Sequence, residues 1–260
     1  MTIKEMNDRR KELGYSYEKL AELSGVPMGT VQKVLGGITK SPRYDTLIAL
    51  ERVLKPYEPL MIRESVAAYG GKKPGEYTIE DYYAWPDDER VELIDGVLYN
   101  MSSPTSIHQV IVSKIYVKLD NYVMSKKGKC VPIGAAVDVQ LDCDDKTIVQ
   151  PDVIVICDRN KFKKGIVYGA PDFVVEVLSP STKKRDKTLK VSKYLNAGVR
   201  EYWIVDPKKK SIVTYTDDGE DDYDVHIYSF EHEVPVQIFH NECKIDFKEI
   251  YEYIEFLYEK

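Results

Sequence analysis

The chain has 260 residues, of which 43% are hydrophobic and 31% charged, a composition typical of globular proteins. This length suits one large domain, or a small domain joined to a medium one. No apolar run approaches the roughly 18 residues that a membrane-spanning helix needs. The charged N-terminus also lacks the apolar core of a signal peptide. We therefore expect a cytoplasmic protein without a membrane partner.

The charge distribution separates the N-terminal part from the rest. The net charge of −6 excludes a uniformly basic surface that coats nucleic acid. The first 56 residues, however, carry 10 basic and 7 acidic side chains, whereas the remainder carries 27 basic and 36 acidic ones. A small basic unit ahead of an acidic body predicts local contact of the N-terminal part with DNA.

The four cysteines are widely scattered and form no C-x-x-C pair; they are Cys130, Cys143, Cys157 and Cys243. This spacing does not indicate a zinc site, and in a cytosol such residues are reduced. We interpret them as structural thiols.

The first 56 residues predict short helices only. Leu13-Gly14 ends the first helix, Ser16 caps the second, and Ser24-Gly25-Val26 forms a tight turn. Pro27 then opens the next helix, and a further helix follows over Tyr44 to Leu54. Two helices joined by a short turn that contains glycine are typical of a helix-turn-helix, whose second helix enters the major groove of DNA.

The segment SYEKLAELSGVPMGTVQKVLGG resembles the phage-repressor (Xre-type, Cro-like) helix-turn-helix, and the resemblance covers about the first 55 residues. The side chains expected to face DNA are Met28, Thr30, Gln32 and Lys33, with Lys40 and Arg43 as phosphate contacts. Such modules bind paired half-sites, which predicts a homodimer on double-stranded DNA. The alternative is a helical bundle for dimerisation or partner binding.

Composition predicts the domain organisation. We assign residues 1–56 to the helix-turn-helix domain, 57–76 to a linker that contains the glycine-rich stretch GGKKPG, and 77–260 to a larger domain.

The larger part predicts a mixed α/β domain with a sheet at its centre. Thr78 to Asp81 is typical of a capped helix start, and VELI-DG-VLYNM within Arg90 to Met101 predicts a hairpin with Asp95-Gly96 at its turn. The other predicted elements are helices over His108 to Met124 and Arg185 to Asn196, strands over Ala136 to Leu141, Pro151 to Cys157, Asp172 to Leu178 and Glu201 to Asp206, and a hairpin loop over Asp217 to Asp222.

Two carboxylates stand in otherwise apolar strands. Asp152 lies at the mouth of the strand PDVIVI, and Glu176 lies inside DFVVEVL, on the same face as Val174 and Leu178. A buried carboxylate without a partner costs several kcal/mol, so a cation or a hydrogen-bond network is expected to hold it. If the strands are adjacent, Asp152 and Glu176 supply the one or two carboxylates that Mg²⁺ requires, and Mn²⁺ is an alternative.

This arrangement resembles the PD-(D/E)XK nuclease fold, in which acids on two strands hold Mg²⁺ and a lysine follows two residues after the second acid. Leu178 occupies that lysine position, which is a departure from the pattern. Asp186, Lys190 and Tyr194 share one face of the following helix because they are four residues apart. Lys190 therefore offers a replacement for the missing ammonium group.

A more specific resemblance covers roughly Tyr77 to Ile254. The strings VELIDG, a helix opened by His108, PDVIVI, VVEVLSPST and D-x3-K-x3-Y-x3-GVREYWIVDP resemble, in the same order, the Uma-two family of restriction endonucleases. The resemblance implies a restriction-endonuclease-like mixed sheet flanked by helices, with Glu92, Asp152 and Glu176 as metal-site carboxylates and Lys190 as the displaced lysine. His108 and Tyr194 match family positions without an assigned role.

Each of these residues also has a simpler interpretation. Asp152 fits a turn at a strand end, Glu176 fits a buried ion pair with Lys190 or Arg185, and Glu92 and Lys190 fit exposed positions. For the whole protein, the sequence favours a DNA-binding, metal-dependent endonuclease that hydrolyses phosphodiester bonds. One alternative is a helix-turn-helix transcriptional regulator whose nuclease-fold domain is catalytically silent and serves dimerisation or sensing. Another is a structural interaction module.

Overall fold

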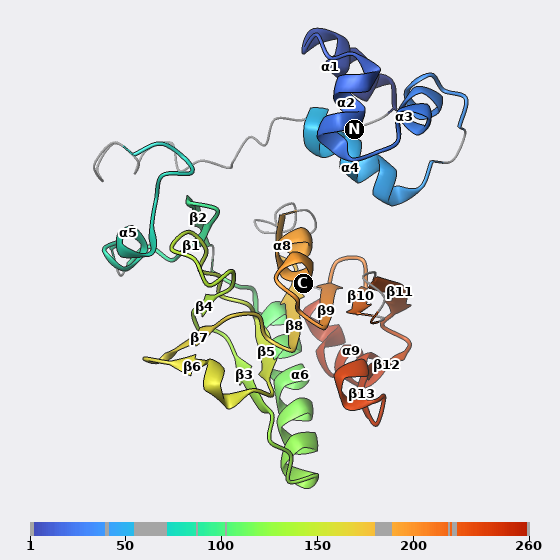
Figure 1. The fold of residues 1–260 in the computed structure, drawn as a ribbon. Helices are drawn as coiled ribbons and strands as arrows, with labels where there is room; N and C mark the ends of the chain where they lie inside the picture. The colour runs from blue at the N-terminus through green and yellow to red at the C-terminus, as the bar shows by residue number, and fades with distance from the viewer. Residues whose placement is uncertain are drawn as a thin grey trace. The chain divides into compact units, whose positions relative to one another are not determined.

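The computed structural model describes residues 3–39, 42–54, 72–86, 88–101, 103–179, 189–217, 219 and 223–258 (Figure 1). The chain divides into two compact units, Met1–Met61 and Ile62–Lys260. Within the described ranges, no helix has both the length and the apolar character needed to cross a membrane. The predicted domain boundaries at residues 56 and 76 stay a prediction.

In the described part of the N-terminal unit, four helices form a bundle: α1 (Ile3–Glu12), α2 (Tyr17–Ser24), α3 (Met28–Leu35) and α4 (Tyr44–Leu54). One apolar cluster joins them and includes the fully buried Leu20 of α2, Val31 of α3 and Leu50 of α4. These are positions that helical periodicity places inward, so packing along one stripe of each helix holds the bundle together.

The connection between α2 and α3 follows the predicted chemistry. Ser16 Oγ accepts a hydrogen bond from the Lys19 amide at 3.1 Å and so caps α2. Gly25 ends the helix in the left-handed region at φ 69°, where a side chain would be strained. Pro27 is the residue before α3. This short turn fixes the angle between the two helices of the helix-turn-helix.

The C-terminal unit is built on a six-stranded mixed sheet with the order β11-β10-β9-β8-β5-β3. In that order the strands are Tyr223–Ser229, Ser211–Asp217, Glu201–Asp206, Phe173–Val177, Val153–Ile156 and Val131–Gly134. The neighbours β8 and β9 are parallel, and the other pairs are antiparallel. Helix α8 (Val191–Asn196) lies in the connection from β8 to β9, as a parallel pair requires.

Different elements cover the two faces of this sheet. On one face, α6 (Ser106–Ser125) and α9 (Phe247–Ile254) pack side by side against a cluster that includes Val175 and Trp203 (Figure 1). On the other face, α8 places Tyr194 against Val174, Tyr202 and Ile204. Because strand side chains alternate, Glu176 shares this second face with Val174.

Smaller elements complete the unit. Helix α5 (Ile79–Tyr83) has a capping box in which Thr78 and Asp81 bond reciprocally. The hairpin β1–β2 has Asp95 and Gly96 at its turn, both with positive φ. The remaining short strands are β1 (Val91–Ile94), β2 (Val97–Asn100), β4 (Val139–Gln140), β6 (Phe162–Lys163), β7 (Ile166–Tyr168), β12 (Glu233–Val236) and β13 (Cys243–Asp246).

Two predictions are corrected. The strand expected over Ala136 to Leu141 is only Val139–Gln140, because this segment pairs with the short β7 and not with the main sheet. Cys130 and Cys157 form a disulfide, so the prediction of reduced thiols is wrong for this pair. The cysteines flank the paired residues Val131 and Ile156 of β3 and β5, which brings them together across 27 residues of sequence. Cys143 and Cys243 are free thiols.

Candidate active site

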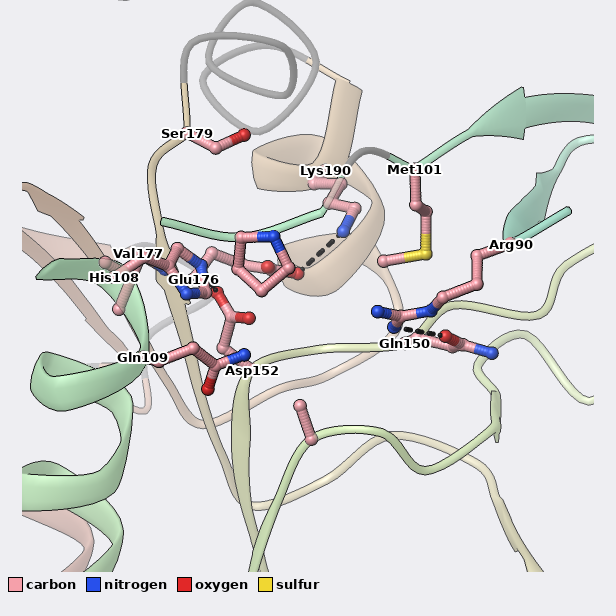
Figure 2. A pocket seen from close by; sticks show the side chains of 12 residues that line it. Arg90, Met101, His108, Gln109, Gln150, Asp152, Glu176, Val177, Ser179 and Lys190 are labelled. Atoms are coloured by element: carbon pink, nitrogen blue, oxygen red, sulfur yellow. Dashed lines mark hydrogen bonds and ion pairs between the residues drawn. The ribbon is translucent and has the colours of Figure 1, made fainter. Parts of the chain in front are cut away.

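The two strand carboxylates lie at the same end of the sheet. Val153 of β5 pairs with Val175 of β8 in an antiparallel register. Continuing this register by one residue brings Asp152 level with Glu176. Asp152 Oδ2 also accepts a hydrogen bond from the Val177 amide at 2.8 Å. Both carboxylates line one cavity, so residues 24 positions apart in the chain converge (Figure 2).

Lys190 joins two of the predicted acids. Its Nζ lies 2.7 Å from Glu92 Oε1 and 2.8 Å from Glu176 Oε1. The Lys190 side chain is 2% exposed, and those of Glu92 and Glu176 are 0% and 5% exposed. Water screens these buried charges very little, so removing the ammonium would leave two buried carboxylates without this counter-charge. The buried ion pair between Glu176 and Lys190, which was one of the simpler interpretations of Glu176, is thus present in the structure.

Tyr194 of helix α8 also contacts Glu176. Its hydroxyl donates to Glu176 Oε1 at 2.7 Å, and its side chain is fully buried. Burial, together with the nearby charges of Glu176 and Glu92, raises the pKa of Tyr194 well above its usual value. The hydroxyl therefore stays protonated and acts as a donor to the carboxylate.

His108 supports Asp152 from the first turn of α6. Its Nε2 lies 3.1 Å from Asp152 Oδ2, and the side chain is 9% exposed. Among the residues that the structure describes, none hydrogen-bonds to the buried Nδ1 of His108. Because a carboxylate oxygen can only accept, Nε2 is the donor in this contact and holds Asp152 in place.

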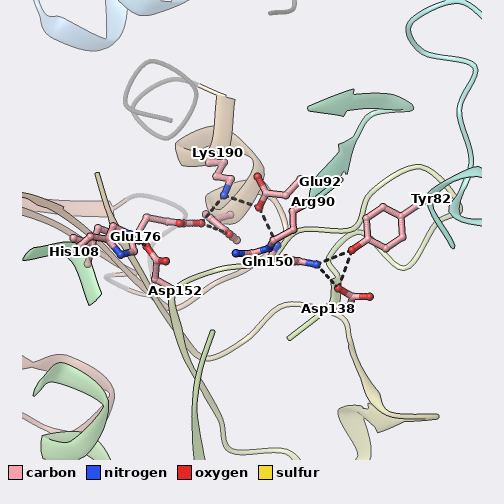
Figure 3. A network of polar contacts seen from close by, with 11 residues as sticks. Tyr82, Arg90, Glu92, His108, Asp138, Gln150, Asp152, Glu176 and Lys190 are labelled. Carbon is pink, nitrogen blue, oxygen red and sulfur yellow. Dashed lines mark hydrogen bonds and ion pairs between the residues drawn. The ribbon is translucent and has the colours of Figure 1, made fainter. Parts of the chain in front are cut away.

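Glu92 belongs to a polar network that extends away from the cavity (Figure 3). Its Oε1 accepts from the Gln150 amide at 2.9 Å as well as from Lys190. The side chain of Gln150 in turn donates to Tyr82 Oη at 2.9 Å and to Asp138 Oδ1 at 3.0 Å. Glu92 is not among the residues that line the cavity. Its geometry suits a counter-ion of Lys190 more than a third ligand of the same cavity.

The carboxylates that face the cavity fit a hard divalent cation. Within the described part of the chain, Asp152 Oδ1 has no hydrogen-bond partner, so it is available to a ligand. Two carboxylates with water completing the shell suit Mg²⁺. Across the described ranges, no three His, Cys, Asp or Glu side chains gather closely enough to hold a metal ion. The donor set that fits is therefore Asp152 and Glu176.

Sequence reasoning did not identify Arg90 and Gln150, which line the same cavity. Each of the two residues precedes a strand with an apolar pattern. Their contact joins residues 60 positions apart, so no local sequence pattern indicates that they share a site. Asp186 and Arg185, which the sequence places near Lys190, lie outside the described residues.

On the N-terminal unit, α3 presents Met28, Gln32 and Lys33 to solvent, and Thr30 is half-buried. Arg43, just before α4, is exposed. Lys40 lies outside the described residues. The exposed side of α3 thus carries groups that are able to contact base edges and phosphates.

Comparison with known proteins places both units. Residues 79–247 match the Uma2 family, whose description is "Putative restriction endonuclease", and residues 6–60 match a helix-turn-helix family. An uncharacterised protein of Synechocystis sp. is 30% identical over 146 residues, which cover 54% of this chain and 75% of that protein.

A solved structure shares the fold. The crystal structure of a "putative nuclease" of the DUF820 group from Anabaena variabilis superposes with a TM-score of 0.56 at 19% identity, covering 68% of this chain and 98% of that one. The predicted restriction-endonuclease-like mixed sheet behind a helical N-terminal unit is thereby confirmed. The matches also confirm the predicted class of DNA-binding, endonuclease-type protein. The chain belongs to the Uma2 family of restriction-endonuclease-type proteins and carries a helix-turn-helix domain ahead of the family domain.

Proposed function

We propose that the chain is a metal-dependent DNA endonuclease whose active site contains Asp152, Glu176, Lys190 and Glu92. The observation that carries the proposal is the convergence of Asp152 and Glu176 on one cavity, with the Lys190 ammonium 2.8 Å from Glu176. Restriction-endonuclease-like folds generally use divalent metals, which agrees with this donor set.

Asp152 and Glu176 are the proposed ligands of Mg²⁺ or Mn²⁺. The bound ion would lower the pKa of a water molecule and neutralise charge on the scissile phosphate. The chain's own residues hold these ligands in place: His108 and the Val177 amide fix Asp152, and Tyr194 fixes Glu176. Because each carboxylate is oriented before substrate binds, little reorganisation is needed at the moment of reaction.

Lys190 is the proposed cation that stabilises negative charge developing on the phosphate. It directly precedes α8 with a helical backbone conformation and compensates for Leu178, which stands where the nuclease pattern has lysine. Glu92 is a buried carboxylate 2.7 Å from Nζ, so it balances the charge of the ammonium and directs it toward Glu176. The contacts of Glu92 with Lys190 and with the Gln150 amide thus support a role as counter-ion to Lys190.

The N-terminal unit is proposed to deliver the acidic C-terminal unit to double-stranded DNA. Met28, Thr30, Gln32, Lys33, Lys40 and Arg43 are the proposed contacts, with Gln32 reading a base and the basic side chains binding phosphate. A homodimer acting in the cytoplasm is proposed as well, because helix-turn-helix units usually bind paired half-sites.

The test compares Asp152→Asn and Glu176→Gln with wild type in a supercoiled-plasmid cleavage assay with Mg²⁺ or Mn²⁺. Both variants should lose metal-dependent cleavage and retain DNA binding in a gel shift. The matched control is Glu201→Gln, which changes a buried glutamate on the opposite face of the same sheet and should cleave normally. Cleavage by Glu176→Gln equal to wild type would exclude the proposed site.

A second candidate function is a transcriptional regulator with a catalytically silent nuclease-fold domain. The contact of Lys190 with both Glu92 and Glu176 favours it, because an ion pair satisfies these carboxylates without a metal. DNA binding by the wild-type chain with no cleavage in either metal would support this alternative.

A further inference from the structure

Arg90 lies at the cavity on the side of Gln150, across from Asp152 and His108 (Figure 2). Its Nη2 donates to Gln150 Oε1 at 3.0 Å, and its side chain is exposed. This is the single side-chain interaction of Arg90 among the described residues. The guanidinium has five N–H donors, so most of them stay available to a ligand in the cavity.

Gln150 is held in an orientation that leaves its oxygen for Arg90. Its Nε2 donates to both Tyr82 Oη and Asp138 Oδ1, so the amide nitrogen is directed away from Arg90 (Figure 3). Tyr82 donates to Asp138 Oδ1 at 2.9 Å. Burial and the Asp138 charge raise the pKa of Tyr82, which keeps this donor protonated. Tyr82 and Asp138 therefore fix the orientation of the Gln150 side-chain amide. The amide oxygen in turn fixes one edge of the Arg90 guanidinium.

The hydrogen-bond partner of Arg90, the Gln150 amide, is neutral. Arg90 differs in this respect from Lys190, the other cation that lines the cavity. Lys190 contacts two carboxylates, which balance its charge. Arg90 forms no ion pair with any described residue. The Gln150 amide therefore positions the guanidinium without neutralising its positive charge. An arginine that is positioned but not neutralised at a cavity wall is suited to an anion, and its planar fork matches the two free oxygens of a phosphodiester.

We propose that Arg90 binds the non-bridging oxygens of a nucleic-acid phosphodiester in this cavity, and that Gln150 positions it. The inference rests on the proposed nuclease function for the class of ligand, but phosphate binding does not require hydrolysis to occur. Asp152 and Glu176 line the same cavity on the side away from Arg90 (Figure 2). A phosphate between the walls would thus meet a guanidinium on one side and the carboxylate pair on the other.

The experiment uses the full chain and a small ligand that is too short to engage a helix-turn-helix. The dinucleotide thymidylyl-thymidine, which has one phosphodiester, is titrated in Ca²⁺ and followed by NMR. Arg90→Ala should bind it roughly ten- to a hundred-fold more weakly than wild type. Arg90→Lys should recover only part of the affinity, since it retains the charge but loses the fork.

Arg159→Ala is the matched control. Arg159 is also an exposed arginine with a neutral partner, since its side chain donates to the backbone carbonyl of Lys129. It should bind the dinucleotide like wild type, and thermal melting verifies that all variants fold. Equal affinity in Arg90→Ala and Arg159→Ala would overturn the proposal, as would a wild-type chain that does not bind the dinucleotide.

Plasmid cleavage by the same variants separates this inference from the function on which it rests. If wild type cleaves, Arg90→Ala should be slower by roughly a hundredfold or more. If wild type binds the dinucleotide through Arg90 and cleaves nothing, the phosphate site stands and the nuclease proposal fails.

Discussion

Lys190 and Lys193, three residues apart, hold the β1–β2 hairpin at two points. Lys190 Nζ lies 2.7 Å from Glu92 Oε1, and Lys193 Nζ lies 2.6 Å from Asp95 Oδ1. The two acids are also three residues apart, one in β1 and one in its turn. Lys193 reaches Asp142 as well. These contacts join the start of α8 and the residue just before it to the hairpin, and so hold this end of the helix beside the cavity.

Replacing Lys193 by Met should loosen this attachment. The Lys193 side chain is 15% exposed, and hydrogen bonds to Asp142 and Asp95 raise its pKa despite the opposing effect of burial, which is the largest single contribution. Asp95 is 59% exposed, so the expected loss of unfolding free energy is about 1–2 kcal/mol. Urea denaturation measures this loss.

The control for Lys193 is Lys244→Met, which removes an ion pair exposed on both sides and should change stability by less than about 0.5 kcal/mol. If Lys190 depends on Lys193 for its position, Lys193→Met should also cleave DNA more slowly than the control. Indistinguishable stability of the two variants would show that α8 is held by its apolar contacts alone.

The sequence was sufficient to predict those parts of the fold that local patterns encode. Asp95-Gly96 between apolar runs specifies a two-residue hairpin, because both turn residues need positive φ. Alternation in DFVVEVL places Glu176 on one face of its strand, and the helical spacing of Lys190 and Tyr194 brings both to that carboxylate.

Other features depend on contacts that no local pattern reveals. The strand β3 contains Pro132 and Gly134, which weaken a strand pattern, and it is stable because it pairs with β5 at the sheet edge. The disulfide between Cys130 and Cys157 follows from the same pairing. The position of Arg90 depends on Gln150, 60 residues away. Helix α9 was not predicted, although its Ile250 and Ile254 are buried at helical spacing.

Replacing Tyr194 by Phe should remove one of the donors to buried Glu176. A hydrogen bond to a charged group contributes about 1.5–3 kcal/mol, so the unfolding free energy should fall by about 2 kcal/mol. Tyr116→Phe is the control, because no described residue hydrogen-bonds to the Tyr116 hydroxyl, and it should be close to neutral. Urea denaturation compares the two. A Tyr194→Phe chain as stable as Tyr116→Phe would mean that the carboxylate is satisfied without the tyrosine hydroxyl.

Lys33 and Gln32 on α3 should affect DNA binding in different ways. Lys33→Ala should weaken binding to all DNA sequences and reduce the slope of log affinity against log salt by about 1, since one phosphate contact is lost. Gln32→Ala should relax sequence preference at one position, at a cost of about 1–3 kcal/mol on the preferred site. Fluorescence anisotropy at several salt concentrations separates the two effects.

The control for α3 is Lys4→Ala, which removes an exposed lysine of α1 and leaves the recognition helix intact. Its salt slope should match that of wild type. If Lys33→Ala and Lys4→Ala bind DNA equally well, α3 is not the surface that contacts DNA, and the helical-bundle alternative for the N-terminal unit gains support.

Glu201 gives the fold a dependence on pH that is separate from the cavity. It is fully buried in β9, where Trp203 Nε1 donates to Oε1 at 2.8 Å and the Ile238 amide donates to Oε2 at 2.9 Å. Burial disfavours the charged carboxylate and raises the pKa of Glu201 to about 7, against an ordinary value of 4.5, although these donors oppose the shift. The folded chain therefore binds a proton more tightly than the unfolded chain between these two values.

The contribution of Glu201 to the free energy of unfolding should consequently be greatest below pH 4.5. It should decrease as the pH rises and level off above about pH 7. The difference between these two pKa values corresponds to a loss of unfolding free energy on the order of 3 kcal/mol. Urea denaturation of wild type and Glu201→Gln between pH 4.5 and 8 measures it, because the difference between the two chains removes the titration of all other groups. Wild type should lose stability relative to the variant over this range.

Glu242→Gln provides a control of opposite sign. Glu242 is exposed, and its hydrogen bond with Lys126 lowers its pKa, so wild type should gain stability relative to this variant as the pH rises through the acid range. Parallel stability curves for wild type and Glu201→Gln would contradict the buried, proton-binding carboxylate. They would mean that the donors from Trp203 and Ile238 stabilise the charged form fully, and that the face of the sheet under α6 and α9 tolerates a carboxylate without a proton.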